Sequence, residues 1–294
     1  GNRGADGVVV ITTKRGGDHG LRSQIDYNFG VQTPFRIPHM ADGYTYASAV
    51  NEALSNDGLS PRYTMHDMRL IAGHMHPQLF PDIDWQALIL RKVAFTHDVN
   101  LTFDGKGQRI RYFVYANYNS NRGFLNNTEM NDGYSTQIGM DALKVRSNIE
   151  ARLTKSTVAR INLMGRLMQY QHPSAGTNLS GMYDTPAAAF YPLAPQSEGG
   201  GWVRSRLCKN PLADLTSRGY NTVLQRTLFA DLTIDQNLEM ITPGLSAQVR
   251  VAYDNSAEIT DMRTCDFAYM EVSSANDEIG NVKELLYTPY GNNR

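Results

Sequence analysis

The side chains most able to bind a metal ion in this sequence are histidines and aspartates in its first third. The histidines are His39, His66, His74 and His76. A His-x-His spacing can bind a metal ion on a strand, but neither a cysteine nor a fixed carboxylate accompanies the pair. Exposed loop histidines are therefore the favoured interpretation. Asp82 and Asp84 flank Ile83 and could ligate Ca²⁺ in a loop, which is again the less favoured interpretation. We expect no bound metal and no cofactor.

The two cysteines, Cys208 and Cys265, offer little further chemistry. A structural zinc site would require a Cys-x-x-Cys pair, which the sequence lacks. A disulfide between two loops stays open as an alternative to two unrelated thiols, which is the favoured interpretation. The sequence also lacks a Gly-x-Ser-x-Gly motif, a paired-carboxylate constellation and a phosphate-binding loop. We therefore expect no enzymatic activity.

The overall composition excludes one class of function and leaves the fold open. The 294 residues carry a net charge of -1, so nucleic-acid binding has no electrostatic footprint. No stretch approaches the roughly 18 consecutive apolar residues of a membrane helix. Transmembrane β-strands escape such a search, because their alternating side chains average out to polar. A soluble β-rich protein and a membrane barrel both fit this composition.

The elements that would position the polar side chains are strands of alternating polarity. From residue 24 to residue 32, apolar and polar side chains alternate strictly, so one face of the strand is apolar and the other polar. Six further segments repeat the alternation: 99–104, 109–119, 144–153, 159–167, 225–234 and 245–254. A weaker strand is expected near residues 265–272. The strands approach the roughly 9–11 residues that a tilted membrane-crossing strand needs, whereas soluble strands are typically about 5–6 residues long.

The connections between these strands alternate between short and long. Short turns are expected at residues 104–108, 154–157 and 237–243, and long polar loops lie between them. An outer-membrane barrel has short inner turns and long outer loops. A soluble sandwich tends toward uniformly short turns, and long unstructured loops are uncommon in compact domains. The sequence therefore predicts an all-β fold, a partial antiparallel transmembrane β-barrel of about seven to eight strands.

The loops and the ends of the sequence contain further signals. Residues 44–54 have the spacing of an amphipathic helix capped by Asp42, and residues 64–72 fit a second short helix. Residues 177–201 are rich in Gly, Ser and Pro and are expected to be irregular. The β-branched run 8–13 indicates a strand buried on both faces. Both ends look cut, so we expect a piece of a longer protein.

The N-terminal segment carries the most specific motif. Its residues are Gly1, Arg3, Gly4 and Gly7, followed by the apolar run and by Lys14-Arg15-Gly16. This segment resembles the end of the plug domain in SusC/RagA-like TonB-linked outer-membrane proteins. Asp84-Trp85, ahead of the 99–104 strand, and the 109–114 strand followed by residues 121–125 also resemble that family. Lys106 departs from the small or acidic residue expected in the turn.

The resemblance implies a division of the chain and a function. Residues 1–18 would end the plug domain, and residues 19–294 would form the N-terminal part of the barrel, in the outer membrane as a multi-pass protein. The family imports nutrients, typically oligosaccharides or peptides, with energy from the TonB-ExbB-ExbD complex and with a SusD-like surface lipoprotein over the outer face. A passive porin or adhesin barrel and a soluble carbohydrate-binding β-sandwich are the alternatives. A plug-end motif favours the importer, because a porin needs no plug.

The resemblance also suggests roles for particular residues. Residues 14–21 would link plug and barrel wall on the periplasmic side. Arg3 would contact a lumen carboxylate such as Asp26 or Glu150, or else pack within the plug loops. Aromatic rings stack on sugar faces, so three side chains in the long loop between the fifth and sixth strands are candidate substrate contacts: Tyr183, Tyr191 and Trp202. The favoured interpretation is that these three side chains pack within the loops or contact the SusD-like lipoprotein.

Overall fold

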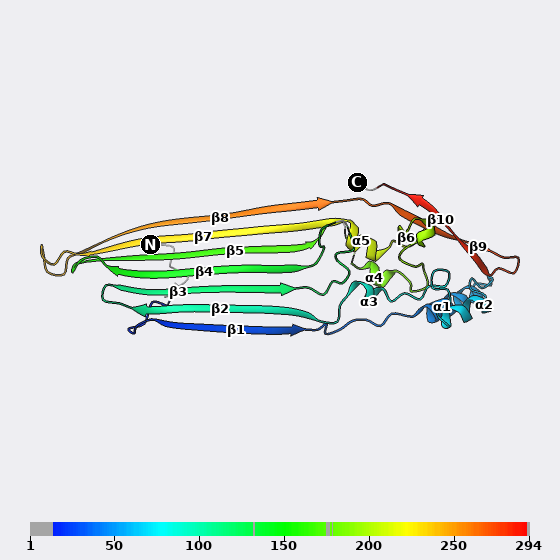
Figure 1. Ribbon diagram of the computed structural model, residues 1–294, viewed down its shortest axis with the longest axis horizontal. Helices are drawn as coiled ribbons and strands as arrows, with labels where there is room; N and C mark the ends of the chain where they lie inside the picture. The colour runs from blue at the N-terminus through cyan, green and yellow to red at the C-terminus, as the bar shows by residue number, and fades with distance from the viewer. Residues whose placement is uncertain (1–13, 132, 175–176, 178, 293–294) are drawn as a thin grey trace.

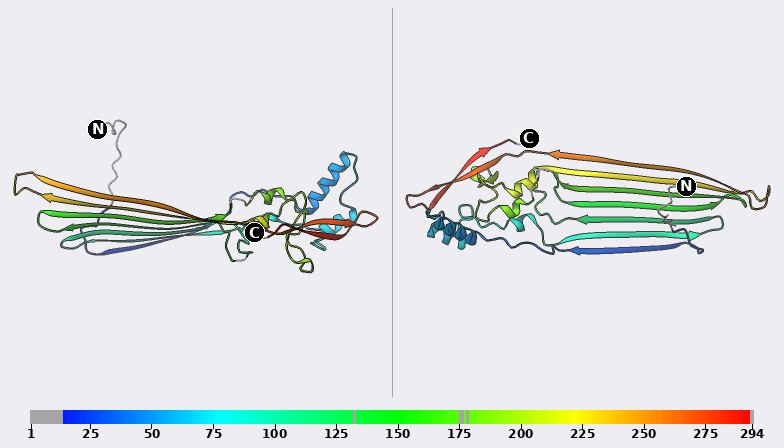
Figure 2. Two further views of the ribbon diagram at one scale, coloured as in Figure 1. Left: turned by 90° about the horizontal axis from the view of Figure 1, so that it is seen from above. Right: turned by 180° about the vertical axis from the view of Figure 1, so that it is seen from behind.

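The computed structural model describes residues 14–131, 133–174, 177 and 179–292, and its main element is a seven-stranded antiparallel sheet (Figure 1). The strands follow the order β1-β2-β3-β4-β5-β7-β8. Their bounds are β1 Arg22–Gln32, β2 Ala94–Lys106, β3 Ile110–Arg122, β4 Gly139–Arg152, β5 Thr157–Pro173, β7 Gly219–Asn237 and β8 Ser246–Thr264. Neighbours in the sheet are mostly neighbours in sequence, so the chain runs up and down. β1 and β8 form the two edges, and the sheet is a single curved layer (Figure 2).

The register carries the alternation of each strand across the whole sheet. Ile25 of β1 lies opposite Leu101 of β2, while Leu232 of β7 lies between Ile161 of β5 and Val251 of β8. A slip of one residue would turn each apolar set to the other face, so these pairs fix one face as apolar. Large apolar side chains stay exposed on that face, among them Tyr27, Phe29, Val31, Phe103, Leu143, Val145, Leu163, Leu167, Leu228, Val249 and Tyr253. An exposed apolar surface of this extent is what contact with lipid requires.

Short turns lie at one end of the sheet and long connections at the other (Figure 1). The Gly107 amide donates to the Ile110 carbonyl in the first turn, and the Leu153 amide donates to the Thr157 carbonyl in the second. The third turn is closed by the Leu238 amide donating to the Leu245 carbonyl. The expected alternation of short turns and long loops is confirmed.

The long connections build a second, mixed region. It contains helices α1 Gly43–Asn56, α2 Met65–Ala72, α3 Trp85–Ile89, α4 Gly181–Asp184 and α5 Pro211–Ser217, and the 3-10 helix η2 Gln196–Glu198. A smaller sheet of order β10-β9-β6 completes it, with β6 Trp202–Arg204, β9 Tyr269–Asn276 and β10 Val282–Tyr290. Residues of this region form two hydrophobic clusters, one around Trp85 and Leu215 and one around Ala47 and Ile71.

The two expected helices are present, and α1 begins after its predicted capping residue, Asp42. The Asp42 carboxylate accepts from the Thr45 amide at 2.7 Å, which starts α1 and holds the pKa of Asp42 below its ordinary value. Thr64 and Asp67 form a reciprocal capping box at the start of α2. Among the described residues, no helix is long and apolar enough to cross a bilayer.

Several expectations need correction or lie outside the described chain. β7 and β8 have 19 residues each, longer than expected, because they stay paired from Asn237 and Ser246 to Gly219 and Thr264, beyond the point where polar and apolar residues stop alternating. The weak strand placed near 265–272 is β9, which joins the small sheet and not the large one. Residues 177–201 include α4, which Gly, Ser and Pro content obscured. The plug motif and the 8–13 run lie outside the described residues, so a domain boundary near residue 18 stays a prediction.

Candidate functional site

The polar face of the large sheet carries a ladder of amides around one carboxylate. Asp98 of β2 accepts from the side-chain amides of Asn117 at 3.0 Å and Asn119 at 3.1 Å on β3. Asn100 donates to the same carboxylate, and the Tyr115 hydroxyl donates to Asn100 Oδ1 at 2.6 Å. Each side chain is held by its neighbour, so the ladder is a preorganised polar surface. Such a surface suits a water-filled lumen and contact with polar groups inside it.

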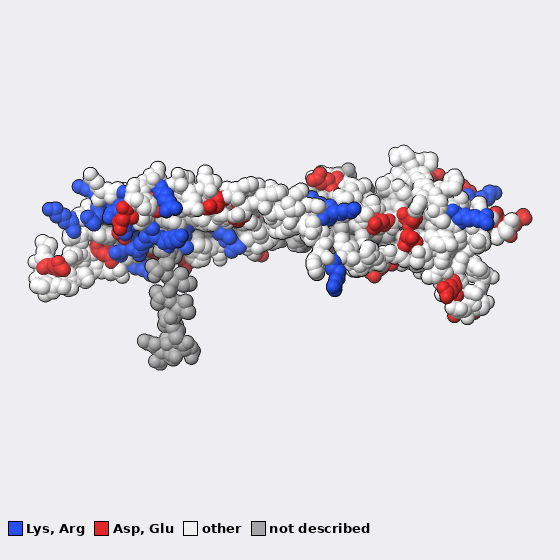
Figure 3. Space-filling view, turned by 90° about the horizontal axis from the view of Figure 1, so that it is seen from below, with Lys and Arg blue, Asp and Glu red and all other residues white. Residues whose placement is uncertain are grey.

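Charged side chains follow on the same face, nearer the short turns. Arg160 of β5 forms ion pairs with Glu150 of β4, at 3.3 Å, and with Asp235 of β7. One strand further, Arg250 of β8 pairs with Asp231 of β7 at 3.1 Å. Figure 3 shows Lys and Arg side chains gathered over this half of the sheet. Each pair joins adjacent strands, so the charges stabilise the register while facing the polar side.

The segment 14–21 lies against this polar face. The side-chain amide of Asn148 donates to the Lys14 carbonyl at 2.7 Å, and Arg15 pairs with Glu150 at 3.0 Å. Gly16 sits so close to the wall that an added Cβ would lie 2.3 Å from the Tyr112 carbonyl oxygen. A side chain at this position would push the segment away, so glycine permits the close approach.

The same segment is also bound to the first short turn. Asp18 pairs with Lys106 at 2.7 Å and with Arg111, and His19 lies 3.1 Å from the Asp104 carboxylate. The Lys106 amide donates to the His19 carbonyl at 2.7 Å. The hydrogen bond from Lys106 and the charge of Arg111 hold the pKa of Asp18 below its ordinary value. The segment therefore lies against the wall where we expected a plug linker, although its role as a linker stays a prediction.

The expected partners of Arg3 are already engaged within the wall. Glu150 is shared by Arg15 and Arg160, and Asp26 accepts from the Gln24 side chain at 2.9 Å. Arg3 itself lies outside the described residues, so its contact with either carboxylate stays a prediction.

The histidines and aspartates of the first long loop have structural contacts. Asp82 accepts from the Gly43 amide at 2.6 Å and lies 3.4 Å from His74, while Asp84 caps α3 through the Ala87 amide at 2.9 Å. Within the described part of the chain, no group of three or more His, Cys, Asp and Glu side chains is arranged to hold a metal ion. Cys208 and Cys265 are both free thiols in the structure, so the disulfide alternative is wrong.

The three aromatic candidates for substrate contact lie in different places. Tyr183 lines a pocket of about 440 Å³ between the segment 39–42 and residues 82–86. Tyr191 lines another, of about 490 Å³, beside β9 and β10. Trp202 packs against the cluster around Trp85 and is paired in register with Tyr269. Tyr183 packs against that cluster as well, and a substrate role for these residues stays a prediction.

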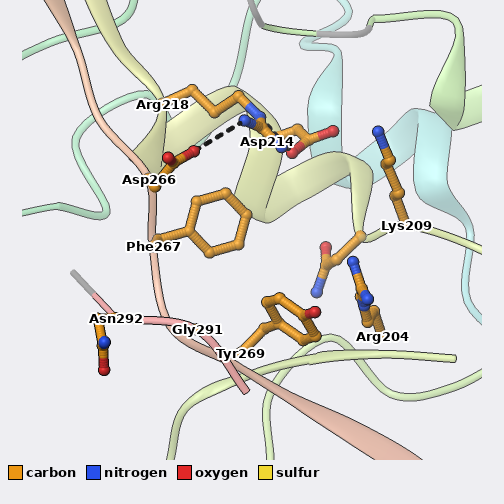
Figure 4. A pocket seen from close by; sticks show the side chains of 10 residues that line it. Arg204, Lys209, Asp214, Arg218, Asp266, Phe267, Tyr269, Gly291 and Asn292 are labelled. Atoms are coloured by element: carbon orange, nitrogen blue, oxygen red, sulfur yellow. Dashed lines mark hydrogen bonds and ion pairs between the residues drawn. The ribbon is translucent and has the colours of Figure 1, made fainter. Parts of the chain in front are cut away.

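A pocket of about 320 Å³, which the sequence did not suggest, lies where α5, β6 and β9 meet (Figure 4). Its charged side chains are Arg204, Lys209, Asp214, Arg218 and Asp266, with Phe267 and Tyr269 as aromatic walls. They come from segments about 60 residues apart in sequence, brought together by the parallel pairing of β6 with β9. The sequence does show several cations between residues 204 and 218. It does not show that these cations lie beside the aromatic residues near position 267.

Comparison with known proteins places this fold. No protein-family model matches the chain. Over 158 residues the chain is 25% identical to the TonB-dependent receptor P26 of Formosa agariphila, a match covering 52% of this chain and 14% of that receptor. The structure is similar to the RagAB peptide importer in its closed-closed state, with a TM-score of 0.60, 16% identity, and coverage of 88% of this chain and 31% of that one. The open-open state gives a TM-score of 0.58 at 14% identity, covering 87% and 30%.

The fold and its exposed apolar face define a class: this is an outer-membrane β-barrel protein, and the described strands are a section of its wall. The resemblance to SusC/RagA-like TonB-linked outer-membrane proteins is confirmed by the receptor and the importer. One is named as a receptor and the other as an importer, and neither is named as an enzyme. A soluble sandwich does not fit a single-layer sheet. The chain spans 14% of the curated relative and 31% of the solved one, so the activity of a whole protein is treated below as a proposal.

Proposed function

We propose that this chain belongs to an active importer of nutrients, energised from the inner membrane through TonB-ExbB-ExbD. The observation that carries the proposal is the position of residues 14–21 on the polar face of the wall, beside the short turns. Arg15 reaches Glu150 in the middle of the sheet, and Asp18 and His19 reach the first turn. A plug attached here would enter the lumen and not the lipid, as an energised gate requires.

The polar face supplies the second line of support. Wide barrels leave an aqueous lumen lined with polar groups, and an importer must block that lumen with a plug. The Asp98 ladder and the Arg160 network present amides, hydroxyls and charges to that lumen. These groups suit reversible hydrogen bonds with a plug that moves during transport.

The proposal extends to partners and cargo. A SusD-like lipoprotein would cover the loop region, where α1, α2 and the small sheet lie beyond one end of the large sheet (Figure 1). The cargo would be an oligosaccharide or a peptide, and the similar RagAB protein is named as a peptide importer. A passive porin or adhesin is the second candidate. It requires neither TonB nor a segment such as residues 14–21 bound to the polar face of the wall.

Energy dependence separates the two candidates. The gene encoding the full-length protein is deleted in its host together with its SusD-like neighbour, and growth is measured on single peptide and glycan sources. We expect growth on one source to be lost, and to be restored by the two genes only while ExbB and ExbD are present. Restoration without ExbB and ExbD would indicate passive passage, and unchanged growth on every source tested would contradict import.

A further inference from the structure

The pocket between α5, β6 and β9 contains two cations that its own acids do not neutralise. Both acids in the pocket form ion pairs with Arg218, whose guanidinium lies 2.7 Å from Asp214 and 3.6 Å from Asp266. Arg204 lies at the other end of the pocket from this triad, and Lys209 lines the flank between them (Figure 4). The pocket therefore has a neutralised side and a cationic side.

Arg204 is fixed in place without its hydrogen bonds being filled. Its guanidinium carbon lies 3.6 Å from the centre of the Tyr269 ring, which is itself stacked on Tyr290. Its nearest carboxylate, Glu271, is 4.0 Å away, at the limit of an ion pair. Among the described residues, no hydrogen-bond partner reaches the buried Nε atom. The planar guanidinium is thus held flat against an aromatic ring, and the outer donors of this partly exposed side chain are the ones that can meet an acceptor in the pocket.

Lys209 completes the cationic side. Its side chain is exposed, and within the described ranges no carboxylate lies at ion-pair distance from its Nζ atom. The backbone around it is rigid, because the next residue, Asn210, donates its side-chain amide to the carbonyls of Pro192 and Val203, each at 2.8 Å. Arg204 and Lys209 thus line one side of the pocket, and the aromatic ring of Phe267 lines the other (Figure 4).

We propose that this pocket binds a carboxylate group of the transported cargo. A guanidinium presents paired donors that match the two oxygens of a carboxylate, and the ammonium group adds a second positive charge. The volume of about 320 Å³ lies at the small end of ligand pockets, so it fits one residue of a larger molecule and not the whole. The inference rests on the proposed import function, because the pocket opens among the long loops, on the side from which cargo would arrive.

Two cargo classes supply this group, the C-terminal carboxylate of a peptide and the carboxylate of a uronic acid in an oligosaccharide. The test uses the purified full-length protein with its partner lipoprotein in detergent. Binding is measured for a fluorescent octapeptide with a free C-terminus and for its C-terminal amide. It is also measured for a fluorescent oligogalacturonide and for its methyl ester. We expect one free acid to bind at least about tenfold more tightly than its neutral partner, as one charge-assisted contact implies.

Variants assign the preference to the pocket. Arg204→Gln and Lys209→Gln should each remove most of the preference for the free acid, and Lys209, being exposed, can be replaced without disturbing the fold. Arg206→Gln is the matched control, because Arg206 is an exposed cation of the same loop outside the pocket. Equal binding of acid and neutral forms, binding of no probe, or a preference that survives in both pocket variants would overturn the proposal. Uptake that depends on ExbB and ExbD in the Lys209→Gln strain would leave the import function standing in each case.

Discussion

At the scale of single residues, Asp18 connects the segment 14–21 to the wall. It is paired with Lys106 and Arg111. The hydrogen bond from Lys106 and the positive charges of both side chains lower the pKa of its carboxyl from the ordinary value of 3.8. A carboxyl with a lowered pKa contributes stability above its unfolded pKa and loses it as the pH falls through the folded one. The attachment of the segment should therefore persist at neutral pH and weaken only below pH 3.8.

A spin label next to Asp18 measures this attachment. Gly20 is a suitable position, because an added Cβ there meets no atom within 4 Å. In the full-length protein we expect a Gly20→Cys label to be immobile at pH 7 and to become mobile only below pH 3.8, the ordinary value for Asp18. Asp18→Asn should make it mobile at pH 7. Asp254→Asn, which removes an exposed carboxylate from the polar face of β8, is the control. A label equally immobile in Asp18→Asn would contradict a role for these ion pairs.

At the scale of elements, Asn210 organises the loop region. Its side-chain oxygen accepts from the amides of Leu212 and Ala213, each at 3.1 Å, and so begins α5, while its amide group donates to two carbonyls of other segments. Pro211 stands at the first helical position, where its missing amide hydrogen costs nothing. The side chain is buried, so each of its hydrogen bonds must be made within the protein.

Replacing Asn210 by aspartate keeps the shape of the side chain and the oxygen that accepts at the start of α5, but it replaces the donating amide group by a second acceptor. A carboxylate would face the carbonyls of Pro192 and Val203, where the amide now donates. We expect Asn210→Asp to lower the free energy of unfolding by about 2–3 kcal/mol, the cost of an unsatisfied buried polar group. Thermal unfolding of the full-length protein in detergent measures the change. Asn56→Asp, at the exposed end of α1, should change stability by less than about 0.5 kcal/mol, and equal effects of the two would disprove the role of Asn210.

The elements also show which parts of the structure can be predicted from sequence. The strands of the large sheet follow from alternation, because one face meets lipid and the other water along their length. α1 and α2 follow from their caps. β6 has only three residues and exists because it pairs with β9, so local sequence does not specify it. The start of α5 has a local signal, because Asn210 is a capping residue and Pro211 follows it at the first helical position. The pocket depends on β6 and α5 together, and it could not be predicted without them.

At the scale of the whole molecule, the large sheet has two edges and one uncovered apolar face. β1 pairs with β2 and β8 with β7, and the outer backbone groups of both edge strands have no partner strand in the described part of the chain. Unpaired edges and an exposed apolar face favour association with other chains or with lipid. In a closed barrel, further strands between β8 and β1 would pair with both edges, and lipid would cover the apolar face.

The present 294 residues should therefore not fold cooperatively by themselves in water. We expect circular dichroism of the isolated chain in aqueous buffer to show no cooperative thermal transition, whereas the full-length protein in detergent shows one. Without neighbouring strands and lipid, both sheet edges and the apolar face are exposed to water. The free-energy cost of this exposure exceeds the stability that the two hydrophobic clusters of the loop region provide. A sharp, reversible transition of the isolated chain in buffer would contradict this expectation.

The central claim is that the large sheet is the wall of an outer-membrane barrel, and alternate accessibility along β8 tests it most directly. Single cysteines are placed from Val249 to Asp254 in full-length protein lacking Cys208 and Cys265, and spin labels on them are exposed to oxygen and to a water-soluble nickel chelate. Labels at Val249, Val251 and Tyr253 should collide with oxygen, and labels at Arg250, Ala252 and Asp254 with the chelate. Equal access of the chelate to both sets would contradict the account.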